Sequence, residues 1–205
     1  GTTRIYKNLQ NDFLYPETNQ LLIFAENHDT NRINDFYPDV KTYKQLLSVI
    51  MTLRGIPQIY YGSEIGMTGK KENGDGDIRR DFPGGWKSDL QNAFVKEERT
   101  PKQNEYFEFT KKILQWRKTN QAIHVGKTLH YVPEKDVYVY FRYTQEQRVM
   151  VIVNNNPSDQ ILNLDRFKEG IAGKKRGYEI STANSFTFDR TIEVPASTTF
   201  IIELN

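Results

Sequence analysis

A cluster of ionisable and amide side chains lies where an apolar run ends, in the segment FAENHDTNR at residues 24–32, whose Phe24 is the last residue of the run LLIF. Charged and amide groups at the end of a buried strand are costly unless they find polar partners. Together they offer hydrogen-bond donors and acceptors, which is the chemistry of a polar-ligand site. We expect five of these side chains to face such a ligand. They are Glu26, Asn27, His28, Asp29 and Arg32.

The composition is that of an ordinary globular chain and excludes several classes of function. Of the 205 residues, 37% are hydrophobic and 26% are charged, enough for one large domain or two small ones. The 28 basic and 26 acidic residues form no long block of one sign, so we expect no nucleic-acid or membrane partner. Cysteine is absent, which excludes disulfides and thiolate metal sites. Aromatic residues make up 13%, which can line platforms for sugars or bases or can simply fill a core and an amphipathic surface.

The first half of the chain alternates predicted helices and strands. Apolar residues at a spacing of four predict a helix over 4–15. The continuous apolar run at 21–25 predicts a short strand buried on both faces of a parallel sheet. A second helix over 39–55, with Gly55 as its C-terminal cap, leads directly to a second buried strand over 56–62. Strand, helix and strand with short connections predict a βα crossover unit.

A long irregular stretch at 63–99 separates this unit from a third predicted helix. A loop of such length in a compact domain is usually functional. The helix begins with a capping box, in which Thr100 is the N-cap, Pro101 the first helical residue and Gln103 the reciprocal partner. It runs to about Thr119 and buries one apolar face.

The period of the apolar pattern changes beyond His124. Short segments rich in β-branched and aromatic residues follow, separated by turn-forming clusters. They occupy residues 137–143, 148–154, 160–164, 185–189, 191–195 and 198–204. We expect them to form a small antiparallel β-sandwich, with the boundary between the two halves near residues 121–126.

Four features occur in an order that resembles one enzyme family. They are the motifs IFAENHDTNRI, GIPQIYYGSEIGM and GDGDIRRDFPGGW, followed by the helix and sandwich. Over essentially the whole chain the sequence is similar to the C-terminal part of the α-amylase-family glycoside hydrolases, within them to the neopullulanase and cyclomaltodextrinase branch. The resemblance implies that residues 1–124 are the last quarter of a (β/α)8 TIM barrel, with 21–25 as its seventh strand and 56–61 as its eighth. Residues 125–205 would be the family's antiparallel β-sandwich domain.

The resemblance gives the polar segment after the first strand a specific role. Asn27, His28 and Asp29 match the motif whose histidine and aspartate hold the 2- and 3-hydroxyls of the sugar at the cleavage point. A carboxylate on the 2-hydroxyl binds more tightly as positive charge develops in an oxocarbenium-like state, which makes Asp29 the candidate catalytic residue. Arg32 is a further candidate for substrate binding. The structural alternative is that Asp29 caps a turn and His28 is a satisfied histidine.

A second candidate site lies in the loop GDGDIR at residues 74–79. The resemblance makes Asp75 and Arg79 the pair that contacts outer glucose units, with a guanidinium fork for vicinal hydroxyls. A calcium loop is a weaker interpretation, because the EF-hand spacing fails at Arg79. A third interpretation is an Asp–Arg pair that only folds the loop. We expect no cofactor in this segment, and calcium elsewhere in the parent enzyme stays open.

Aromatic and histidine side chains outside these motifs have weaker claims on function. Tyr60, Tyr61 and Trp86 could stack on sugar rings, although tyrosines on a strand belong more often to the core. His124 and His130 have no metal-ligand partners at useful spacing, which indicates structural roles.

The chain holds only one of the three catalytic carboxylates that the resemblance implies. The nucleophilic aspartate and the acid/base glutamate would lie on earlier strands, before Gly1, and neither Glu26 nor Glu64 replaces the acid/base. We expect a fragment of an enzyme that cleaves α-1,4-glucosidic bonds of starch, pullulan or cyclodextrin with retention, and that is inactive by itself.

Two other classes of function stay open. One is a non-catalytic starch-binding or assembly module, and the other is a transglycosylase or isomerase with the same motif after strand seven. The expected partner in each case is an α-glucan, and open strand edges leave a homo-oligomer as an alternative. No stretch is long enough to span a membrane, and the N-terminal GTTRIYKNLQ does not resemble a signal peptide. The resemblance favours a periplasmic or extracellular location, with a cytoplasmic one as the alternative.

Overall fold

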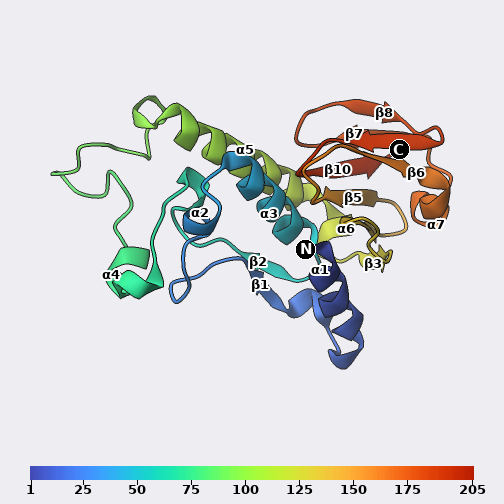
Figure 1. Ribbon diagram of the computed structural model, residues 1–205, viewed down its shortest axis with the longest axis horizontal. Helices are drawn as coiled ribbons and strands as arrows, with labels where there is room; N and C mark the ends of the chain where they lie inside the picture. The colour runs from blue at the N-terminus through green and yellow to red at the C-terminus, as the bar shows by residue number, and fades with distance from the viewer.

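The computed structural model describes residues 1–205 and contains helices in the first half and mainly strands in the second (Figure 1). The α-helices are α1 (Thr2–Leu9), α2 (Ile33–Phe36), α3 (Val40–Thr52), α4 (Asp75–Ile78), α5 (Pro101–Thr119), α6 (Gln121–His124) and α7 (Lys168–Ile171). The strands are β1 (Leu22–Phe24), β2 (Ile56–Gln58), β3 (Lys127–His130), β4 (Val137–Tyr143), β5 (Arg148–Asn154), β6 (Gln160–Asn163), β7 (Arg176–Glu179), β8 (Ser185–Thr187), β9 (Thr191–Val194) and β10 (Thr198–Leu204). None of the helices is both long and apolar enough to cross a membrane.

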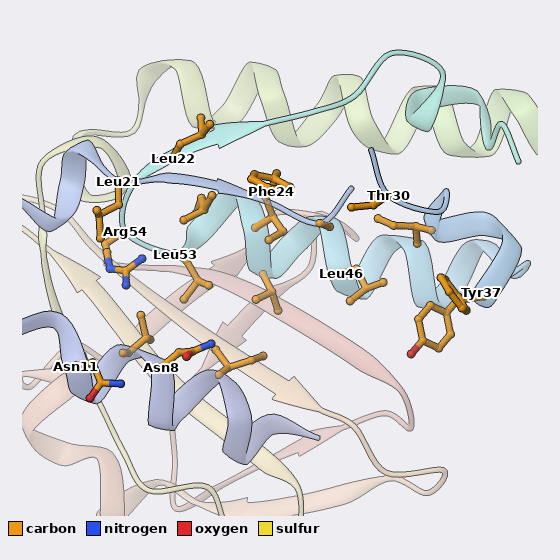
Figure 2. Close-up of a pocket in the computed structure, with 18 of the residues that line it drawn as sticks. Asn8, Asn11, Leu21, Leu22, Phe24, Thr30, Tyr37, Leu46, Leu53 and Arg54 are labelled. Carbon is orange, nitrogen blue, oxygen red and sulfur yellow. The ribbon is translucent and has the colours of Figure 1, made fainter. Parts of the chain in front are cut away.

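β1 and β2 form a parallel pair that α3 connects, which confirms the predicted βα crossover unit. Ile23 packs against the hydrophobic core, but Leu22 and Phe24 are 57% and 41% exposed. The prediction that this strand is buried on both faces is therefore wrong, because successive side chains point to opposite faces and only one face has core neighbours. The strand borders a cavity of about 940 Å³ with mostly apolar walls, which lies between β1, α1 and α3 (Figure 2).

The two ends of α3 differ in how they are capped. Asp39 closes the N-terminus by accepting a backbone hydrogen bond from Thr42 at 2.7 Å. The predicted capping role of Gly55 is wrong, since Leu53 is the cap residue and has an extended backbone. Gly55 has a φ of +109°, and a Cβ at this position would lie 2.5 Å from the carbonyl oxygen of Leu21. Glycine is required here by the close approach of the two chain segments that enter β1 and β2.

α5 confirms the predicted capping box and packs beside α3. Gln103 N donates to Thr100 Oγ1 at 3.2 Å, and Thr100 N donates to Gln103 Oε1 at 2.8 Å. Between the two helices, the Tyr43 hydroxyl lies 2.8 Å from Thr110 Oγ1. Burial raises the pKa of Tyr43, so this hydroxyl stays neutral and its hydrogen bond persists at any ordinary pH.

The predicted β half contains a six-stranded antiparallel sheet, in the order β3-β4-β5-β10-β7-β8, and a two-stranded sheet of β6 and β9. Side chains of β4 alternate between two hydrophobic clusters. Tyr138 and Tyr140 face the cluster that contains α3 and α5, whereas Val139 and Phe141 face the cluster that contains β9. Burial of both faces accounts for the largely apolar sequences of β4 and β5. Since both halves of the chain share one cluster, their division after residue 124 stays a prediction.

α1 packs against the six-stranded sheet and contacts it through hydrogen bonds and an aromatic pair. Thr2 donates from N and Oγ1 to Asp136 Oδ1, at 2.8 and 2.7 Å. His130 Nδ1 lies 2.8 Å from the Tyr138 hydroxyl, and the His130 ring packs on Tyr6 with centroids 4.9 Å apart. Burial lowers the pKa of His130, which favours its neutral form in this contact. Both of these contacts are with side chains of the fold, as the predicted structural role of His130 requires.

The first helix is shorter than predicted. Its α-helical part ends at Leu9, and a 3₁₀ turn over Gln10–Leu14 changes the side-chain spacing. Phe13 leaves the apolar stripe for this reason and is 80% exposed.

Candidate functional site

The polar segment after β1 forms a tight turn that presents two side chains to solvent. Asp29 N donates to Asn27 Oδ1 at 2.9 Å, and Asn27 N donates to Thr30 Oγ1 at 3.0 Å. Asn27 therefore closes the turn, which is the role that the structural alternative gave to Asp29. The side chains of His28 and Asp29 stay 59% and 58% exposed, with His28 Nε2 3.2 Å from Asp29 Oδ2.

A second segment supplies an arginine to this turn. Arg79 follows α4 and donates from Nε to the His28 carbonyl oxygen and from Nη2 to Asp29 Oδ1, each at 3.0 Å. The same Nη2 lies 2.9 Å from Asp75 Oδ2. Figure 1 places α4 beside the turn that follows β1. The structure thus joins the two predicted sites, although Asp29 and Arg79 are 50 residues apart in the sequence.

Asp75 has two cationic neighbours and stays open to solvent. Lys71 Nζ donates to Asp75 Oδ1, while Arg79 holds the other carboxylate oxygen. The hydrogen bond from Lys71 lowers the pKa of Asp75, which is therefore ionised at neutral pH. The ion pair expected of a loop-folding role is present, yet the side chains of Asp75 and Arg79 are 51% and 39% exposed. Both groups can still reach a ligand.

Two of the residues expected to face a ligand point inward instead. Glu26 is 3% exposed and accepts hydrogen bonds from the Ser63 hydroxyl and from a backbone N–H. Arg32 is fully buried and donates to the carbonyl oxygens of Ile78 and Tyr61, at 3.0 and 2.6 Å. Arg32 Nη1 lies 3.5 Å from Glu26 Oε1. The expectation is wrong for both residues, because buried charges need partners and these two find them beneath the turn.

The rings of Tyr60 and Tyr61 both pack against this buried arginine. The guanidinium carbon of Arg32 lies 3.9 Å from the Tyr60 ring centroid and 4.9 Å from that of Tyr61, both within cation–π range. No local pattern in the sequence predicts this contact. The one available signal was the pair of opposite charges, Glu26 and Arg32, on either side of a single turn.

The exposed groups suit the recognition of neighbouring hydroxyls. Asp29 offers a charged acceptor, Arg79 a fork of donors, and His28 an imidazole that can donate or accept. The predicted stacking residue Trp86 lies on the loop between α4 and α5 and is 64% exposed. The structure contains no group of three or more His, Cys, Asp or Glu side chains placed to hold a metal ion.

Two family models match the chain, one in each half. Residues 2–90 match the model described as alpha amylase, catalytic domain, and residues 128–203 match the cyclo-malto-dextrinase C-terminal domain. The first match contains both the turn after β1 and the loop at 74–79.

Named relatives match over most of this chain. The cyclomaltodextrin glucanotransferase of Niallia circulans is 33% identical over 144 residues, which make up 70% of this chain and 18% of that protein. The maltogenic alpha-amylase of Bacillus acidopullulyticus is 27% identical over 199 residues, which make up 93% of this chain and 30% of that protein. The chain therefore spans less than a third of the length of these relatives.

Solved structures share the fold of the whole chain. The alpha-amylase of Geobacillus thermoleovorans, solved in complex with acarbose, matches with a TM-score of 0.77 at 20% identity, over 98% of this chain and 42% of that one. An Anoxybacillus alpha-amylase matches with a TM-score of 0.78 at 21% identity, over 98% and 41%. With the fold and both family models in agreement, this chain belongs to the α-amylase family and joins part of its catalytic domain to a cyclo-malto-dextrinase C-terminal domain.

Proposed function

We propose that this chain supplies part of the sugar-binding site of an α-glucan hydrolase of the neopullulanase and cyclomaltodextrinase type. The observation that carries the proposal is the exposed Asp29 carboxylate, which Arg79 holds at 3.0 Å on the turn directly after β1. Asp29 would accept a hydrogen bond from the 2-hydroxyl of the sugar at the cleavage point, and His28 would bind the 3-hydroxyl. The enzyme would cleave α-1,4-glucosidic bonds of starch, pullulan or cyclodextrin with retention.

The negative charge of Asp29 is what gives it a catalytic role in this proposal. The sugar gains positive charge in the oxocarbenium-like transition state, so a carboxylate on the 2-hydroxyl binds that state more tightly than the substrate. Arg79 fixes the orientation of the carboxylate, and His28 Nε2 lies 3.2 Å from its other oxygen. A held carboxylate loses less conformational freedom when the sugar binds.

The fold supports placing this turn in an active site. Polar residues just past the strands of a (β/α)8 barrel lie at the face where active sites are built. In the proposal β1 and β2 are strands seven and eight, residues 1–124 end the barrel, and residues 125–205 form the family's β domain. The apolar cavity beside β1 is where other barrel elements of the complete protein would pack (Figure 2).

The reaction needs two more carboxylates, and we infer that they lie outside this chain. A retaining glycosidase places a nucleophile and a proton donor about 5–5.5 Å apart. Asp75 shares Arg79 with Asp29, but its lowered pKa excludes it as the proton donor. Burial raises the pKa of Glu64, yet this residue lines a cavity against α5 and not the turn that carries Asp29.

We expect the complete protein to release reducing sugar from soluble starch, pullulan or cyclodextrin, and the 205-residue chain alone to release none. Both proteins are purified and assayed side by side on the three substrates. Activity that follows the chain through every column would contradict the assignment of the missing carboxylates. A complete protein without activity on any α-glucan would contradict the proposed function itself.

Glucan transfer is a second candidate for the reaction. It is favoured by the match to cyclomaltodextrin glucanotransferases, of which the Niallia circulans protein is 33% identical. Hydrolysis and transfer differ in whether water or another sugar accepts the glycosyl group, and the sugar contacts of Asp29 would serve both. Chromatography of the products from maltoheptaose separates the two: shorter linear sugars indicate hydrolysis, and cyclic or longer products indicate transfer.

Asp75→Ala in the complete protein should weaken the binding of long substrates more than that of short ones. If Asp75 contacts outer glucose units, its loss raises KM for maltoheptaose roughly tenfold and changes KM for maltotriose less than about twofold. Arg79→Ala should impair the reaction with both substrates, because Arg79 also holds Asp29.

Asp77→Ala is the matched control for this series. Asp77 lies two residues from Asp75, but its carboxylate accepts hydrogen bonds from Lys70 N and the Asn73 amide and pairs with Arg80 Nε at 3.4 Å, with no hydrogen bond or ion pair to Asp29 or Arg79. We expect this control to leave KM unchanged for both maltoheptaose and maltotriose. Equal losses for maltoheptaose and maltotriose in Asp75→Ala would assign Asp75 to loop folding alone.

A further inference from the structure

The loop between α4 and α5 exposes large apolar side chains that no part of the chain covers. Trp86, Leu90 and Phe94 are 64%, 105% and 65% exposed. In Figure 1 this loop extends away from the body of the molecule, on the side where α4 lies. Exposed aromatic groups of this size usually mark a place where a ligand or a partner binds.

The Trp86 ring is held in place although it is exposed. Its indole Nε1 donates to Asp81 Oδ2 at 2.9 Å, and its backbone N donates to Asp89 Oδ2 at 3.1 Å. The ends of the loop are closed by a hydrogen bond from Ala93 N to the Pro83 carbonyl oxygen at 2.9 Å. A ring fixed from both its side chain and its backbone can bind a flat partner at a low cost in entropy.

Trp86 is connected to the candidate sugar site through a short stretch of chain. Its partner Asp81 is two residues from Arg79, so their Cα atoms are at most about 7.6 Å apart. The backbone of the intervening Arg80 is also held, because the Tyr61 hydroxyl donates to its carbonyl oxygen at 2.8 Å. Through Asp81, the indole is therefore fixed to the chain segment that carries Arg79, the residue that holds Asp29.

We propose that Trp86 is a stacking platform for an outer glucose unit of long α-glucans. This inference rests on the proposed function and assigns a further residue to the same site. A glucose ring has an apolar face of C–H groups and a rim of hydroxyls, and it needs an aromatic surface with polar groups around it. Trp86 offers the surface, and the Asp81 carboxylate lies at its edge, 2.9 Å from the indole Nε1. The Phe82–Phe94 pair, with centroids 4.5 Å apart, supports the loop beneath.

Trp86→Ala in the complete protein tests this platform. We expect kcat/KM for maltoheptaose to fall tenfold or more and that for maltotriose to change less than about twofold. Trp86→Phe keeps an aromatic face and should recover most of the loss. Tyr178→Ala is the matched control, since Tyr178 is a 38% exposed aromatic residue on β7 of the six-stranded sheet. This control should leave kcat/KM unchanged for both maltoheptaose and maltotriose.

The outcomes separate this inference from the proposed function. If the wild-type protein acts on α-glucans and Trp86→Ala is unimpaired on maltoheptaose, the platform is refuted and the function stands. If Trp86→Ala instead abolishes self-association in gel filtration with unchanged kinetics, the loop is an interface between copies and the platform is again refuted. If the wild-type protein has no activity on α-glucans, calorimetric titration with maltoheptaose tests whether Trp86 contributes to sugar binding. Tighter binding by wild type than by Trp86→Ala supports the platform, and equal or absent binding overturns it.

Discussion

Replacing Asp29 by Asn in the complete protein is expected to lower kcat by roughly 10³-fold and to change KM less than about threefold. Asparagine keeps the shape of the side chain and can still accept the hydrogen bond from Arg79. It lacks the charge that would strengthen the contact with the sugar as the transition state forms. The loss therefore appears in kcat, measured from initial rates on maltoheptaose at saturating substrate.

The fold should survive this change, because the Asp29 side chain is 58% exposed and Asn27 rather than Asp29 closes the turn. Circular dichroism of the variant should match that of the wild type. Asp77→Asn is the control, an exchange of the same kind on the neighbouring segment, and it should keep the full rate. An Asp29→Asn variant with more than a tenth of the wild-type kcat would show that Asp29 only shapes the turn.

Arg32→Met is expected to destabilise the protein by about 3–5 kcal/mol. The substitution leaves the Glu26 carboxylate buried without its cation, 3.5 Å from where the guanidinium stood. It also removes the hydrogen bonds to Ile78 O and Tyr61 O and the stacking on Tyr60. Urea-induced unfolding followed by circular dichroism measures the loss of stability.

A second variant and a surface pair make this prediction specific. Glu26→Gln combined with Arg32→Met removes the stranded charge, so the double variant should be more stable than Arg32→Met alone. Lys44→Met removes a cation from an exposed pair, with Lys44 Nζ 2.7 Å from Glu105 Oε1, and should cost less than about 1 kcal/mol. Equal losses for Arg32→Met and Lys44→Met would refute the account of the buried pair.

The sequence alone determined the elements whose signals are local. The capping box at Thr100 and Gln103 places the start of α5, because its hydrogen bonds involve only residues three positions apart. The apolar runs before residues 26 and 63 predict the parallel pair, and the β-branched runs predict most of the antiparallel strands. β3 and β7 were missed, since KTLH and RGYE are short and half polar and acquire strand structure from their neighbours β4 and β10.

Only the tertiary structure decided which polar side chains of the segment after β1 face outward. Glu26 and Arg32 point inward, toward Ser63 and Ile78. These partners are 37 and 46 residues away in the sequence, so no local spacing reveals the contacts. His28 and Asp29 remain outside because Asn27 closes the turn beneath them. The contact between Asp29 and Arg79 exists only because the chain returns to this turn after α4. The residue types in this segment limit which ligands it can bind. Long-range contacts decide which of its side chains face outward, because the direction of a side chain in a turn depends on what packs against it.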